Sequence, residues 1–123
     1  MLKEIIWVGA GSAIGGISRF AIGRWISSIA NISFPVSTFS INIIGSFIIG
    51  MLLAVQSKHG LSSATMLFLA TGFCGGFTTF STFSLENILL IKQGQLGIAF
   101  LYMIASLILG LAAVYSGYKV IGH

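Results

Sequence analysis

The side chains of this sequence that could do chemistry are hydroxyls, an amide and aromatic rings, and they are densest between positions 72 and 84. That stretch holds three glycines, five hydroxyl side chains and four phenylalanines. Neutral hydroxyl and amide groups donate hydrogen bonds, and a seam of donors without acids favours an anion over a cation. The candidate donors are Thr38, Asn42, Thr79, Ser81, Thr82, Ser84, Tyr102 and Ser106.

Phenylalanines are interleaved with these hydroxyls. Phe77, Phe80 and Phe83 recur every three residues, which predicts that they share one side of a helix. The edge of a phenyl ring carries partial positive charge and can face an anion. Phe80 and Phe83, which flank hydroxyls, are the candidates for this role, whereas packing is the favoured interpretation of Phe73 and Phe77.

The composition is that of a membrane protein. The chain has 123 residues, of which 56% are hydrophobic and 7% charged, and its mean hydropathy is +1.05. A soluble domain would carry about 25% charged residues. We expect a multi-pass protein of the cell inner (plasma) membrane, built as one all-α domain over residues 1–123. Four spans of about 20 residues are expected near 4–28, 36–55, 62–91 and 96–120.

Three of these spans have a face of small or polar residues. Residues four apart lie on one face of a helix, and such a face must contact protein or water rather than lipid. In the first span, Gly11 and Gly15 form a GxxxG pair that permits close helix packing. The other two faces are formed by Thr38, Asn42, Ser46, Gly50 and Ala54 in the second span and by Tyr102, Ser106 and Gly110 in the fourth.

The third span is longer than a single straight crossing needs, and it is rich in glycine. We expect it to be broken in mid-membrane at Gly75–Thr78, because glycine permits backbone angles that a helix forbids. Irregular backbone at this depth must be buried in protein or line a wet cavity. Its carbonyl oxygens can coordinate a cation, so two copies that bring their breaks together could share a Na⁺.

The basic residues show almost no bias between the two sides of the membrane. With four spans, Lys3, Lys58 and Lys119 lie on one side, and Arg24, Lys92 and, if it is counted, Arg19 lie on the other. Orientation is normally set by such a bias. We therefore expect the chain to insert in both orientations and to form an antiparallel, dual-topology homodimer.

Several classes of function are disfavoured. The sequence has no Asp and no paired carboxylates, so it is not expected to be an enzyme, and it has no basic cluster of the kind that binds nucleic acid. A small multidrug-type proton-coupled antiporter fits the length, but it needs an acid in the first span, where this chain has Arg19. A membrane scaffold without transport activity stays open.

The motif Gly72-Phe-Cys-Gly-Gly-Phe-Thr-Thr-Phe-Ser-Thr-Phe-Ser-Leu-Glu86 resembles the signature of the small dual-topology fluoride channels, the Fluc or CrcB family. Ser37–Gly50 is similar to the second motif of that family and Gly15–Phe20 to its first. The resemblance covers essentially the whole chain. It implies an antiparallel homodimer with two fluoride pores and a structural Na⁺ at the dimer axis, which exports fluoride passively.

The resemblance also implies roles for single residues. Phe80 and Phe83 would be the pore phenylalanines, Asn42 the polar pore residue of the second span, and the backbone oxygens of Gly75 and Thr78 the Na⁺ ligands. The hydroxyls after the break would form a polar track. Arg19 would be the arginine of the first span.

Two charged residues keep more than one interpretation. Arg19 lies close enough to the end of its span to reach the headgroups, or it acts electrostatically at a vestibule. Glu86 pairs with a cation or with a neighbouring hydrogen-bond donor, and a role in gating is the less favoured alternative. Tyr102 could also be an ordinary core residue whose hydroxyl has a partner.

Overall fold

The computed structural model describes residues 1–122, which contain helices and no strands. Four helical units are long and apolar enough to cross a membrane, and the third of them is interrupted. This confirms the predicted all-α fold with four spans, the third of them broken. The elements are α1 (Leu2–Ile29), α2 (Val36–His59), α3 (Ser63–Met66), the π-helical η1 (Leu67–Cys74), α4 (Gly75–Phe77), α5 (Phe80–Lys92) and α6 (Leu96–Gly122).

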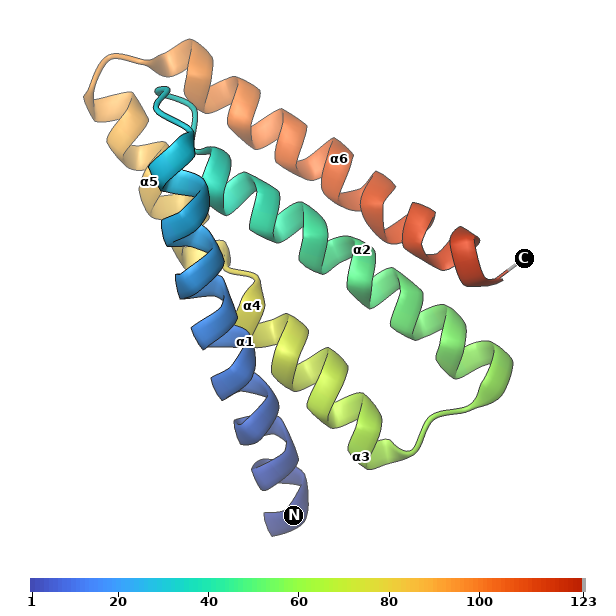
Figure 1. The fold of residues 1–123 in the computed structure, drawn as a ribbon. Helices are drawn as coiled ribbons and strands as arrows, with labels where there is room; N and C mark the ends of the chain where they lie inside the picture. Colours follow the sequence, from blue (N-terminus) through green and yellow to red (C-terminus); the bar gives the residue numbers. More distant parts are fainter. Residues whose placement is uncertain (123) are drawn as a thin grey trace.

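The spans associate as two pairs. Figure 1 shows α1 crossing the broken third span and α2 running beside α6. Glycines permit both contacts, because a Cβ built on Gly11 would lie 2.1 Å from the carbonyl oxygen of Phe68, and one on Gly50 would lie 2.1 Å from that of Val114. The GxxxG face of the first span therefore packs closely against another helix, as predicted.

The break in the third span lies at Thr78 and Thr79, slightly later than the predicted Gly75–Thr78. Both residues have extended backbone, with φ/ψ of −88/159° and −150/124°. Gly75, by contrast, is helical, with φ −64° and ψ −37°. Glycine's conformational freedom is therefore not what breaks this helix. The helix stops because Thr78 and Thr79 leave the helical region, and Thr79 then caps α5.

The glycine beside the break serves close packing instead. A Cβ on Gly76 would lie 2.6 Å from the carbonyl oxygen of Ser12 on α1. Gly45 on α2 is restricted in the same way, since its Cβ would lie 2.2 Å from the Cγ2 methyl of Thr78. Small residues therefore let α1 and α2 approach the break from two sides.

An aromatic cluster holds the first turn of α5 against α6 and α2. Tyr102 is fully buried, and its ring contacts those of Phe34, Phe39 and Phe83 in edge-to-face geometry, at 4.8 Å for Phe83. Edge-to-face contacts of this kind add to the stability gained from burial of the rings. The cluster fixes the position of α5 just beyond the break.

Candidate functional site

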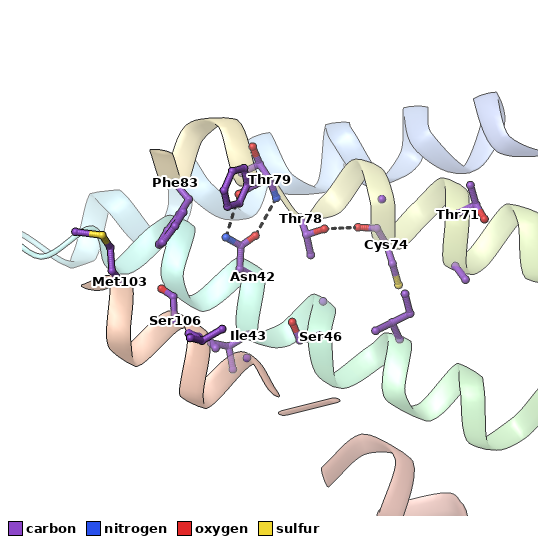
Figure 2. A pocket seen from close by; sticks show the side chains of 17 residues that line it. Asn42, Ile43, Ser46, Thr71, Cys74, Thr78, Thr79, Phe83, Met103 and Ser106 are labelled. Carbon is purple, nitrogen blue, oxygen red and sulfur yellow. Dashed lines mark hydrogen bonds between the residues drawn. The ribbon is translucent and has the colours of Figure 1, made fainter. Parts of the chain in front are cut away.

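The break faces a cavity of about 650 Å³. Its walls come from α2, the broken third span and α6, and Figure 2 shows their side chains converging on it. Residues from all three spans that the sequence singled out therefore meet at one place. The candidate site residues that line the cavity are Asn42, Gly75, Thr78, Thr79, Phe80, Phe83 and Ser106, and Ser46 and Gly110 of the two i+4 faces line it as well.

The phenylalanines do not all share one side of a helix. Phe80 and Phe83 follow the break and line the cavity, with ring centroids 5.8 Å apart. Phe77 precedes the break, is 2% exposed and stacks on Phe73 at 5.5 Å. The prediction that Phe77 shares one side of a helix with Phe80 and Phe83 was wrong, because the extended backbone of Thr78 and Thr79 rotates the chain between Phe77 and Phe80. The packing interpretation of Phe73 and Phe77 agrees with their stacking.

Asn42 reaches from α2 to the break. Its Nδ2 donates to the carbonyl oxygen of Thr79 at 3.1 Å, and its Oδ1 accepts from the Thr79 N–H at 2.9 Å. Figure 2 shows both bonds beside the hydrogen bond from the Thr78 hydroxyl to the carbonyl oxygen of Cys74, which is 2.8 Å long. The side chain thus lines the cavity and also holds the interrupted backbone.

Some backbone carbonyl oxygens at the break accept a hydrogen bond, and two do not. Nε of Arg19 donates to the carbonyl oxygen of Gly76 at 3.1 Å, so this arginine ties α1 to the break. The N–H of Thr79, which a continuous helix would direct to Gly75, bonds to Asn42 instead. Within residues 1–122, the carbonyl oxygens of Gly75 and Thr78 accept no hydrogen bond. Two acceptors at the break are therefore available to a ligand.

Glu86 accepts two hydroxyl hydrogen bonds. The hydroxyl of Thr38 donates to Oε2 and that of Tyr102 to Oε1, both at 2.8 Å. The interpretation that Glu86 pairs with neighbouring donors is confirmed. Because each hydroxyl has a single hydrogen, Thr38 and Tyr102 have no hydrogen left for an anion while these bonds persist.

A second, smaller cavity of about 200 Å³ lies between α1, α2 and the start of α5. Arg19 and Arg24 line it, together with the hydroxyl residues Ser37, Thr38 and Thr82. The two guanidinium groups give this cavity positive charge, which suits an anion. Thr79 lines both this cavity and the large one, so the break separates them.

Three predicted seam residues lie away from these cavities. Ser81 is exposed and contacts the hydroxyl of Thr79 at 3.3 Å, Ser84 is half-buried and Tyr102 is fully buried, and none of the three lines the large or the small cavity. Ser106 lines the large cavity, and its hydroxyl is buried without a hydrogen-bond partner in the described part of the chain. Among the described residues, no group takes up the hydroxyl hydrogen of Ser106.

The sequence reasoning missed several lining residues. Thr71 and Cys74 face the large cavity from η1, and Met103 does so from α6. Thr71 and Cys74 precede Gly75 and Thr78 at intervals of four residues, so an i+4 search extended upstream of the motif could have found them. Met103 gives no such signal, because methionine is common in packed cores.

The comparisons with known proteins cover almost the whole chain. The family described as "CrcB-like protein, Camphor Resistance (CrcB)" matches residues 6–118. A protein of Agrobacterium fabrum named "Fluoride-specific ion channel FluC" is 44% identical over 115 residues, which is 93% of this chain and 92% of the relative. A protein of Thermus thermophilus with the same name is 40% identical over 121 residues, 98% of this chain and 95% of the relative. With its four apolar spans and broken third helix, this multi-pass membrane protein therefore belongs to the CrcB family.

Proposed function

We propose that this protein is a fluoride-selective channel that lets fluoride leave the cell passively across the lipid bilayer. The observation that carries the proposal is the large cavity, in which the Asn42 amide, the Ser106 hydroxyl and the rings of Phe80 and Phe83 meet at a helix break. Donors and ring edges of this kind can replace the hydration water of a small anion. The names of the relatives, which are fluoride-specific ion channels, agree with this chemistry.

The position of the acid argues against a proton-coupled antiporter. Such a carrier needs an ionisable group that faces its substrate. Glu86 lines neither cavity, and both of its oxygens accept hydroxyl hydrogen bonds. An acid held in this way serves to orient Thr38 and Tyr102. The channel interpretation requires no titrating group in the large cavity.

The working unit that we propose is an antiparallel homodimer. Phe80, a lining residue of the large cavity, is 79% exposed in the single chain, so this chain alone does not enclose its cavity. A second copy is the simplest way to cover that ring and complete a pore. The even distribution of basic residues over the two membrane faces supports an inverted orientation of the second copy.

A Na⁺ at the dimer axis is the proposed structural cofactor. The carbonyl oxygens of Gly75 and Thr78 accept no hydrogen bond within residues 1–122, and both residues line the face that a second copy would cover. Carbonyl oxygens of an unwound helix suit a Na⁺, so the residues present fit this ion. When bound, Na⁺ would be a positively charged partner for these two carbonyl oxygens.

Arg19 and Arg24 mark the entrance that we propose for the anion. They bring positive charge to the small cavity, which shares its lining residue Thr79 with the large one. A positively charged mouth raises the local concentration of anions. Because Arg19 also bonds to the carbonyl oxygen of Gly76, it would combine an electrostatic role with a structural one.

The test is ion efflux from liposomes that contain only this protein. Fluoride release, followed with a fluoride electrode, is expected to be fast, and chloride release from matched liposomes is expected to be absent. Equal chloride and fluoride release would contradict the proposal. Transport of an organic cation driven by a pH gradient would favour the antiporter, and a scaffold would show no transport at all.

A further inference from the structure

The side-chain amide of Asn42 forms two hydrogen bonds with one residue, one through its nitrogen and one through its oxygen. It donates to the Thr79 carbonyl oxygen at 3.1 Å and accepts from the Thr79 N–H at 2.9 Å, across 37 positions of sequence. These are the two backbone groups of a residue that has left the helix. A paired donor and acceptor of this kind supplies what an adjacent strand would supply to an extended residue.

The bonds matter because of where Thr79 lies. Unpaired backbone groups at membrane depth are costly, and Thr79 precedes α5 with extended backbone angles. Its hydroxyl oxygen accepts from the N–H of Thr82 at 3.2 Å, which caps α5. The conformation of Thr79 therefore determines where α5 begins, and with it the positions of Phe80 and Phe83.

We infer that Asn42 is a positioning residue, which holds the backbone of Thr79 and thereby sets the start of α5 and the placement of the two cavity phenylalanines. The expected effect of Asn42 on fluoride efflux rests on the proposed channel function. The second hydrogen on Nδ2 stays available to an ion in the cavity, so a direct contact is a separate role. The two roles differ in what happens to α5 when the amide is removed.

The N–H of Thr82 reports on positioning, because Asn42 does not touch it and Thr79 does. We would compare Asn42→Ala with the wild type by NMR-detected amide hydrogen exchange of the detergent-solubilised protein, and measure fluoride efflux in parallel. Exchange at Thr82 is expected to rise by about tenfold as α5 frays at its start, and fluoride efflux should fall. Ser40→Ala, on α2 and outside both cavities, is the matched control and should change neither.

A double variant tests whether Asn42 acts through Thr79. Thr79→Ala removes the capping hydroxyl and should also speed exchange at Thr82. Combining it with Asn42→Ala should add little, because changes that act through one contact are not additive. Should Asn42→Ala fail to fold, Asn42→Gln takes its place, since it retains the amide but is too long to keep both bonds in register.

Three results decide the inference. Lost efflux with unchanged exchange at Thr82 would mean that Asn42 acts on the ion directly, and would overturn it. Faster exchange with unchanged efflux would overturn it as well, since the start of α5 would not matter for transport. If the wild type conducts no fluoride, the proposed function fails, and exchange at Thr82 still decides whether Asn42 holds α5.

Discussion

The hydroxyl of Tyr102 on α6 donates a 2.8 Å hydrogen bond to Oε1 of Glu86 on α5. The ring of Tyr102 is fully buried, and Thr38 on α2 binds the other carboxylate oxygen at 2.8 Å. One carboxylate thus joins three spans beside the cavity. It also takes up the hydroxyl hydrogens of two residues that the sequence suggested as anion donors.

Removing that hydroxyl tests the contribution of this link to stability. Tyr102→Phe keeps the ring and its aromatic contacts and leaves Oε1 of Glu86 without its donor. We expect a loss of about 1 kcal/mol in the free energy of unfolding, measured by denaturation in mixed micelles. Tyr115→Phe is the control, since Tyr115 is 63% exposed and the Lys119 ammonium lies over its ring, 5.7 Å from the ring centre. An equal loss in both variants would argue against a special role for the link.

The phenyl edge of Phe80 is expected to matter for transport. Phe80→Ile removes the ring while roughly keeping its apolar bulk, so fluoride efflux should fall by about tenfold, equivalent to ~1.4 kcal/mol in the barrier. Size-exclusion chromatography should show an unchanged assembly. The matched control is Phe100→Ile on α6, because Phe100 is 54% exposed and lines neither cavity. Normal fluoride efflux in Phe80→Ile would show that this ring is not part of the proposed site.

Close packing of α1 against the third span gives a prediction about stability. A Cβ on Gly11 would meet the backbone oxygen of Phe68 at 2.1 Å, whereas one on Gly9 would meet nothing within 4 Å. Gly11→Ala should therefore destabilise the protein by about 1–3 kcal/mol through overpacking. Gly9→Ala should be neutral or slightly stabilising, because alanine favours helix. Thermal unfolding of both variants in the same detergent compares them directly, and similar melting temperatures would refute the close crossing.

Substitution of Gly75 tests the proposed dimer. Within one chain a Cβ on Gly75 meets nothing within 4 Å, and the backbone there is already helical. Gly75→Val should therefore fold, and should weaken dimerisation only if a second copy covers this face. Light scattering is expected to give a monomer for Gly75→Val and a dimer for the wild type.

The control for this experiment is Gly97→Val. Gly97 is also helical, exposed and free of neighbours within 4 Å, and it lies outside the large cavity. It should leave the dimer intact. A dimeric Gly75→Val protein would contradict the proposal that the broken helix lies in the interface.

The inward faces of the helices could be predicted from the sequence. Glycines at four-residue spacing predicted that α1 packs closely on another span, and the structure has this contact at Gly11. The i+4 line of α2 predicted a face turned away from lipid, and Thr38 and Ala54 on it are buried. Such faces can be predicted from a sequence because the period of the helix alone decides which residues share a face.

The pairing of polar groups, by contrast, depends on how the helices pack. Thr38 and Glu86 are 48 positions apart, and Asn42 and Thr79 are 37 apart, so no local rule relates them. Hydrogen bonds at membrane depth are set by which groups meet when the helices pack. The same packing turned Phe77 inward while Phe80 stayed in the cavity, because two extended residues between them broke the helical period on which the sequence argument depended.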